Sequence, residues 1–395
     1  METPRSIHAV GRESLPVFFV SFLRLGLTAF GGPAMVAYIR DLAVKKKEWI
    51  SEESFRHGVA VCQSIPGATA MQVAAYVGLR AGGAVGALAT YVGFGLPAFL
   101  LMVAMAAFYG RAHDLATVVS AFRGLQVIVV ALVANATLGF GRTSIRKWQD
   151  AVLALGAAAF LVARGSPIMA IAASAVLGLI LYRESELRAG ERGATDNVAL
   201  LKNLGAPVFL VLVLLASLLF LYFWDKKLFD LSALMLKVDL FALGGGYASV
   251  PLMLHEVVGA RHWIDSKTFM DAIALGQVTP GPIVITATFV GYLIAGLPGA
   301  IVGTVSIFTP SLVILTAVVP YFDRLQGNPL FQRGLRGALV SFVGLLLAVT
   351  IQFSMALHWG AVKVLIAALA FLALRLRVDI LWVVLAGAGV SALVL

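Results

Sequence analysis

Four short runs of glycine and proline interrupt apolar stretches of this sequence. They are Gly31-Gly32-Pro33, Pro66-Gly67, Gly244-Gly245-Gly246 and Pro280-Gly281-Pro282. Glycine and proline break helices, and a half-helix that begins at Gly67 or Gly281 points unpaired N–H groups and the positive end of its dipole at whatever lies there. The chemistry that this pattern predicts is the binding of an anion.

Neutral hydrogen-bond donors accompany the breaks. Close to the two Pro-Gly pairs stand Thr69, Gln72, Thr279, Thr286 and Thr288, and about one helical turn before each pair, in matched positions, stand Gln63 and Gln277. These side chains either contact the anion or satisfy backbone carbonyls that the breaks set free. We expect the substrate-binding residues among them and among the tips Gly31, Gly32, Pro66, Gly67, Gly244, Gly245, Pro280 and Gly281.

Two cations stand inside apolar segments. Arg24 lies in FVSFLRLGLTAF and Lys237 lies in ALMLKVDLFAL, at equivalent places. A charge within a membrane segment costs about 2.5–3.5 kcal/mol on insertion scales and is by default a functional-site hypothesis. One cation from each half suits a dianion, whereas the alternative is that the long side chains reach the membrane interface.

Acidic residues inside apolar segments are Asp239, two positions after Lys237, and Asp271, before Gln277. Asp239 either neutralises Lys237 or takes up and releases a proton as the coupling ion, since burial and a neighbouring cation act on a carboxylate in opposite senses. Both acids are candidates for proton coupling.

No enzyme motif accompanies these residues. The sequence contains no HExxH, no GxSxG and no Gly-rich P-loop, and its six histidines are scattered. The single cysteine, Cys62, excludes a multi-cysteine metal site. We therefore expect no enzyme, no metal and no cofactor.

The chain repeats itself at an offset of 213 residues. TAFGGPAMVAYI from Thr28 aligns with FALGGGYASVPL from Phe241, and with one-residue gaps the match continues through Trp49 and Trp263, the two Pro-Gly pairs, and Arg123-Gly124 with Arg336-Gly337. Matched Trp, Pro and Arg in the same order indicate a duplication.

The elements that position these residues are membrane helices. Hydrophobic residues make up 60% and charged residues 13% of the 395 residues, so a water-facing surface cannot be built. The net charge of +10 comes from basic residues in short loops, as cytoplasmic-loop bias predicts, and not from a nucleic-acid surface. The predicted fold is an all-α polytopic membrane protein.

Each half reads as two broken segments followed by four plainer ones, which in the first half are 17–38, 57–79, 84–108, 117–140, 148–164 and 166–182. We expect a first repeat at 1–182, a polar linker and one connecting transmembrane helix at 183–228, with the apolar stretch from Pro207 to Trp224, and a second repeat at 229–395. Each half contributes an even number of segments, so one added membrane span between them places the second half upside down relative to the first. Many secondary transporters have such inverted repeats.

The basic run from Arg40 through Lys45, Lys46 and Lys47 to Arg56 decides between two topologies. If the broken segments are re-entrant hairpins, this run and most other Lys and Arg lie on the side of the N-terminus, which the positive-inside rule makes cytoplasmic. Kinked full-length spans are the alternative. The expected location is the inner (plasma) membrane.

The motifs resemble those of the chromate ion transporter family, long-chain two-domain type. They are FGGP from Phe30, QSIPGATAMQVAAYVG from Gln63, LGGGYASVPL from Leu243 and QVTPGPIVITATFVGY from Gln277. The resemblance implies export of chromate or the similar dianion sulfate, driven by an ion gradient, and a homodimer. Ala68 stands where the family more often has a second proline. A passive anion channel is the alternative function.

Overall fold

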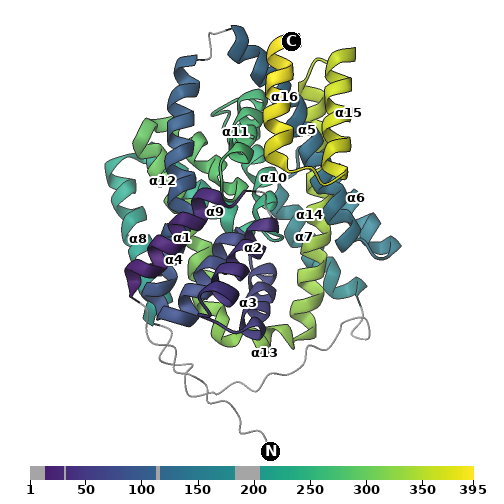
Figure 1. Cartoon of the computed structure of the whole chain (residues 1–395). Helices are drawn as coiled ribbons and strands as arrows, with labels where there is room; N and C mark the ends of the chain where they lie inside the picture. Colours follow the sequence, from purple (N-terminus) through teal and green to yellow (C-terminus); the bar gives the residue numbers. More distant parts are fainter. Residues whose placement is uncertain (1–13, 31–32, 113–115, 183–204) are drawn as a thin grey trace, which may run out of the picture.

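The computed structural model describes residues 14–30, 33–112, 116–182 and 205–395. The N-terminal tail, the tip glycines Gly31 and Gly32, and the polar linker that begins at Arg183 lie outside the described residues. Within the described part, every regular element is a helix and none is a strand, which confirms the all-α fold (Figure 1).

The helices follow the two predicted halves. Those of the first half are α1 (Leu15–Thr28), α2 (Pro33–Arg40), the π-helix η1 (Asp41–Lys46), α3 (Glu52–Ser64), α4 (Thr69–Ala112), α5 (Ala116–Ser144), α6 (Trp148–Val162) and α7 (Pro167–Leu181). Those of the second half are α9 (Lys226–Phe241), α10 (Ser249–Met253), the π-helix η5 (Leu254–Ala260), α11 (Ser266–Val278), α12 (Thr286–Val318), α13 (Phe322–Gln326), α14 (Pro329–Ala356), α15 (Ala361–Arg375) and α16 (Ile380–Val394). Between the halves runs α8 (Gly205–Trp224).

Five of the described helices are long and apolar enough to cross a membrane, and four shorter ones are also apolar. The connecting helix α8 is the least buried of the five long ones, since only Pro207 and Leu221 are buried in it. It packs mainly against α9 and α12. Its outward side chains include Phe209, Leu212 and Phe220. Such an apolar surface is stable against lipid and not against water, which makes the protein an integral membrane protein.

The backbone itself repeats. A π-helix stands at the same place in each half, since η1 begins at Asp41 and η5 begins at Leu254, 213 residues later. The four described non-glycine residues in the left-handed region form two matched pairs, Glu48 with His262, both at φ 51°, and Arg164 with Arg377, at 66° and 64°. Because side chains rarely adopt this conformation, the agreement confirms the duplication.

Each long helix that follows a Pro-Gly break is bent by a glycine. Left-handed φ values of 68° at Gly83 and 61° at Gly296 divide α4 and α12 into a short arm and a long arm. The two arms touch beside the bend in both helices. In α4 a Cβ on Gly78 would lie 2.3 Å from the Gly86 carbonyl oxygen, and in α12 one on Gly291 would lie 2.2 Å from the Gly299 carbonyl oxygen. The short arms pair with α3 and α11, so each forms a hairpin whose tip is the Pro-Gly pair.

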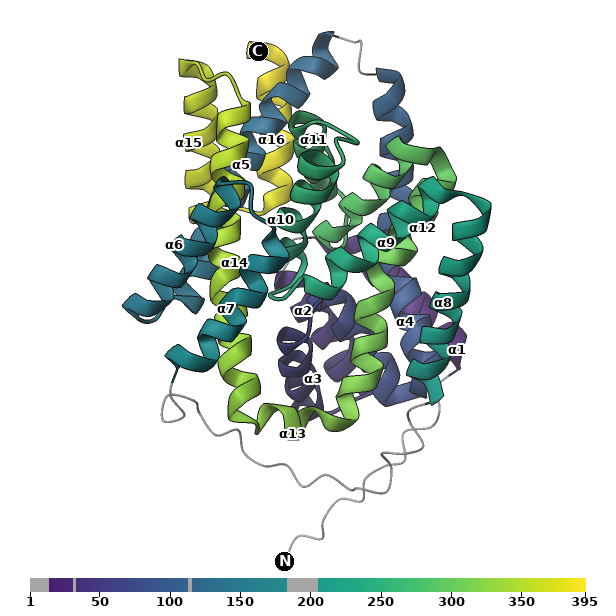
Figure 2. The same ribbon diagram turned by 180° about the vertical axis from the view of Figure 1, so that it is seen from behind.

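The equivalent hairpins approach from opposite ends of the molecule. In both views α3 lies towards one end, with α13, and α11 lies towards the other, with the end of α16 (Figures 1 and 2). The tips of the two hairpins meet between these ends.

The last helices of each half are exchanged. α6 and α7 pack against α14 of the second half, α15 and α16 pack against α5 of the first, and α5 contacts α14 (Figure 2). Small residues allow the close approach: a Cβ on Gly337 would lie 2.1 Å from the Ser174 carbonyl oxygen, and one on Gly124 would overlap Ser391. Neither half therefore has a complete core of its own.

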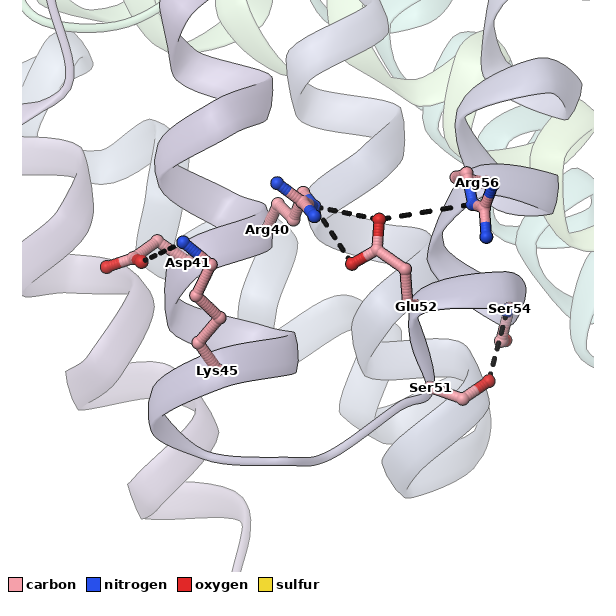
Figure 3. Close-up of polar contacts among 7 residues, drawn as sticks. All are labelled: Arg40, Asp41, Lys45, Ser51, Glu52, Ser54 and Arg56. Carbon is pink, nitrogen blue, oxygen red and sulfur yellow. Dashed lines mark hydrogen bonds and ion pairs between the residues drawn. The ribbon is translucent and has the colours of Figure 1, made fainter.

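The basic run between α2 and α3 is a structured turn (Figure 3). Arg40 Nε lies 2.9 Å from both carboxylate oxygens of Glu52, and Lys45 lies 3.4 Å from Asp41. Ser51 Oγ accepts the N–H of Ser54 at 3.1 Å and so caps α3. This turn joins the two broken segments of the first half at the end where α3 begins.

Candidate functional site

The two Pro-Gly tips are held by the opposite half. The Gly67 N–H donates to the Ala242 carbonyl at 3.0 Å, and the Gly281 N–H donates to the Ala29 carbonyl at 3.1 Å. Ala29 and Ala242 are themselves equivalent residues, each two positions before the first glycine of a break. The two hydrogen bonds are thus the same bond made twice. The region formed by Gly67 with Ala242 and by Gly281 with Ala29 is called the crossing below.

Only glycine fits at the two tips. Gly67 has φ 116° and Gly281 has φ 113°, in the left-handed region. A Cβ on Gly67 would lie 2.3 Å from Ser311 Cβ, and one on Gly281 would lie 2.9 Å from Ala98 Cβ. Ser311 and Ala98 are equivalent positions that follow Pro310 and Pro97, so each tip rests on the long helix of the other half.

Helix starts follow the tips, as the sequence predicts. α4 begins at Thr69, and a 3-10 turn, Ile283–Ile285, leads into α12 at Thr286. On the facing break, Gly244 and Gly245 have left-handed φ values of 103° and 95°. A Cβ on Gly245 would lie 3.2 Å from Thr69 Oγ1, so the start of α4 faces the glycine turn of the second half.

Several of the predicted donors bond to nearby backbone carbonyls. Gln72 Nε2 donates to Pro66, Thr279 Oγ1 donates to Gly276 at 2.9 Å, and Thr286 Oγ1 donates to Ile283 at 2.6 Å. In this conformation these three satisfy the freed carbonyls, which was one of the two alternatives. Gln72 also has a buried Oε1 with no partner among the described residues.

The two matched glutamines differ. Gln63 is exposed, whereas Gln277 is half-buried and its Nε2 donates to the Tyr247 hydroxyl at 3.0 Å. Tyr247 belongs to the facing glycine turn, and its ring contacts Phe140 edge to face. Sequence reasoning missed Tyr247, although it follows Gly246 directly.

The two cations lie away from the buried core. Arg24 is exposed on α1, and the side chain of Lys237 is 46% exposed on α9. Lys237 Nζ lies 2.6 Å from Glu256 Oε1, whose second oxygen is 3.9 Å from Arg261. Of the two alternatives for Asp239, neutralisation of Lys237 therefore finds no support in this structure, because two side chains two residues apart on a helix point in different directions.

Asp239 instead points at α12. Its Oδ2 accepts the backbone N–H of Ser311 at 2.7 Å, while its Oδ1 is buried with no partner among the described residues. Ser311 Oγ lies 3.0 Å from the Tyr91 hydroxyl. Since Ser311 also abuts Gly67, this carboxylate stands one residue away from the tip of the first hairpin.

Asp271 lies elsewhere, on α11 towards the end where that helix begins. Its Oδ1 accepts Gln126 Nε2 at 2.9 Å and its Oδ2 accepts the Tyr109 hydroxyl at 2.9 Å. The described residues hold no group of His, Cys, Asp and Glu that could bind a metal ion.

The helices are duplicated, two of them are bent, and helix breaks lie where the two halves meet. This is the architecture of a polytopic membrane transport protein. The chain belongs to the chromate transporter family, because the family model described as "Chromate transporter" matches residues 17–179 and again residues 229–392. The family resemblance of the four motifs is confirmed.

Relatives cover nearly the whole chain. An uncharacterized transporter of Methanocaldococcus jannaschii is 46% identical over 95% of this chain and 94% of its own length. The chromate transport proteins of Cupriavidus metallidurans and Pseudomonas aeruginosa are 30% and 32% identical over 86% of this chain and 82% and 81% of their own lengths. No solved structure matches the chain.

Proposed function

We propose that this protein is a secondary active transporter that exports chromate, or the related tetrahedral dianion sulfate, across the inner membrane and so confers chromate resistance. Membership of the family supports the substrate class. The reciprocal hydrogen bonds from Gly67 to Ala242 and from Gly281 to Ala29 carry the mechanism, since they place two equivalent hairpins from opposite ends at one crossing.

The crossing suits alternating access. Two equivalent hairpins can exchange roles when one opens towards its own end and the other closes, and inverted repeats provide such a pair of states. The anion lies beside the start of α4, where Thr69 faces Gly245 and where helix N-termini favour negative charge. Gln63, Gln277 and the two tips complete this site in the proposal, and Arg24 and Lys237 draw the dianion towards it from outside the core.

The coupling ion in this proposal is a proton carried by Asp239. A buried carboxylate oxygen without a partner is unfavourable when ionised, and protonation turns that oxygen into a donor. Because Asp239 touches Ser311 and Ser311 touches Gly67, a change at this carboxylate reaches the tip directly. The basic turn from Arg40 to Arg56 supports a cytoplasmic N-terminus.

Reconstituted vesicles test the proposal. Purified protein in liposomes should accumulate chromate when a proton gradient is imposed, and sulfate should compete better than phosphate. The matched control is Gly67→Ala at equal protein content. Flux that persists without a gradient and does not saturate would instead indicate a passive anion channel, and the absence of any chromate flux would refute the transport function.

A further inference from the structure

A cavity of about 480 Å³ lies away from the crossing, at the end of the molecule where α11 begins and α16 ends. It is bounded by the end of α4 and by α5, α11, α15 and α16. The residues that give it chemical character are Arg123, Lys267, Lys363, Asp271, Gln126 and Tyr109. Asp271, a predicted site residue, thus lines this cavity together with its two hydrogen-bond partners, Gln126 and Tyr109.

The cavity carries an excess of positive charge. Arg123, Lys267 and Lys363 form no ion pair with any residue of the described part of the chain, and Lys363 Nζ donates only to the His358 carbonyl at 2.9 Å. The carboxylate of Asp271 is occupied by Gln126 and Tyr109. Among the described lining residues, three cations therefore stand against the single carboxylate of Asp271.

The duplication supplies a comparison for this cluster. Arg123 is equivalent to Arg336, and Lys363 is equivalent to Asp150, at the same offset of 213 residues. At the other end of the molecule, Arg336 lies 3.0 Å from the buried Asp150 and its guanidinium stacks over the Tyr182 ring at 4.1 Å. The same two backbone positions therefore hold an ion pair, Arg336 with Asp150, at one end of the molecule. At the other end they hold two cations, Arg123 and Lys363.

Arg123 and Lys267 are exposed and Lys363 is partly exposed, so these charges remain hydrated, and an anion that enters the cavity is attracted by all three. Three positive charges around one cavity match a tetrahedral dianion, whose oxygens accept charge-assisted hydrogen bonds. We propose that this cavity binds an oxyanion of the sulfate and chromate type and holds it before or after its passage through the crossing. The inference deepens the proposed function, on which it rests.

Helix α11 connects the cavity with the crossing. Lys267 and Asp271 lie on its first turns, and Gln277 and the Pro280-Gly281 tip lie at its far end. At about 1.5 Å per residue the path from Lys267 to Gln277 is about 15 Å along the axis.

Three variants test the site. Arg123→Gln and Lys363→Gln each remove one charge, and Lys363→Asp recreates beside Arg123 the acid that pairs with Arg336 in the other half. In reconstituted vesicles we expect each to raise the half-saturating sulfate concentration by about ten-fold with little change in the maximal rate, as loss of electrostatic capture does. Lys226→Gln, on an exposed lysine outside the cavity, is the matched control.

Binding is measured separately from transport. Sulfate should raise the melting temperature of the purified wild-type protein. This rise should be smaller in Lys363→Asp, in which sulfate still binds at the crossing, while the variant without sulfate melts no lower than wild type. An equal rise in both proteins, or none in wild type, would overturn the cavity site. Wild-type vesicles that transport no oxyanion would refute the proposed function, whatever the melting experiment gives.

Discussion

The carboxylate of Asp239 and the backbone N–H of Ser311 are joined by a hydrogen bond of 2.7 Å that ties α9 to α12. Ser311 follows Pro310 and touches the Gly67 tip, so the bond joins an ionisable group to the point where the two halves cross. The other oxygen of Asp239 has no described partner, and this unequal use of two oxygens motivates the first prediction.

Asp239→Asn should abolish proton-driven accumulation of chromate while leaving the exchange of chromate across the membrane. The amide oxygen still accepts the Ser311 N–H, so we expect the protein to fold and to exchange chromate for chromate. Accumulation driven by a proton gradient should be lost, because the amide takes up no proton at neutral pH. Both fluxes are measured in the same vesicles with labelled chromate, and Asp271→Asn is the companion variant. Undiminished driven accumulation would remove the proton-coupling role.

Gly67→Ala should abolish transport. Its Cβ would lie 2.3 Å from Ser311 Cβ, and the left-handed backbone alone costs about 1–3 kcal/mol for a residue with a side chain. Gly281→Ala meets Ala98 at 2.9 Å and should be the milder of the two. Melting temperature and chromate flux are the measurements. Gly139→Ala, where nothing lies within 4 Å of the added Cβ, should melt no lower than wild type.

Arg336→Leu should destabilise the protein strongly. It leaves Asp150 fully buried without its cation, and breaking one partner of a buried pair costs about 3–5 kcal/mol. The Tyr182 hydroxyl and the N–H groups of Arg146 and Lys147 still bond to Asp150, which should keep the effect near the lower limit. The double variant with Asp150→Asn should recover part of the loss in melting temperature, and exposed Arg142→Gln should change little.

Arg24→Gln should lower chromate export from everted vesicles by about ten-fold if this cation draws the dianion towards the crossing. Lys237→Gln should have a smaller effect, because Glu256 already neutralises that lysine at 2.6 Å. Protein content is matched by immunoblot. Export at the wild-type rate in Arg24→Gln would show that its side chain only reaches the membrane surface.

The repeat, the helical class and the breaks could be predicted from the sequence because they depend on local residue types. A glycine that bends α4 and a proline before Ser311 are visible as letters. The partners of the polar groups could not be predicted, since they come from the other half. No sequence pattern near Asp239 indicates Ser311 as its partner, and none near Asp150 indicates Arg336.

Helical geometry explains why the acid next to Lys237 in the sequence is not its partner in the structure. Lys237 and Asp239 are neighbours in the sequence, yet two residues apart on a helix face different directions, so the lysine meets Glu256 on η5 and the acid meets α12. The cavity was likewise hidden, because Arg123 and Lys363 are separated by most of the chain and only their matched partners, Arg336 and Asp150, form a pair.

The exchange of the last two helices between halves has a consequence for biogenesis. While the chain is being made, α5 is inserted long before α15 and α16, which cover it in the finished protein. The surface of α5 that α15 and α16 later cover is therefore exposed in the bilayer until synthesis ends. Partly assembled intermediates of this kind are prone to misfolding and need protection. Synthesis halted within the linker after α7 should leave a product that quality-control proteases remove.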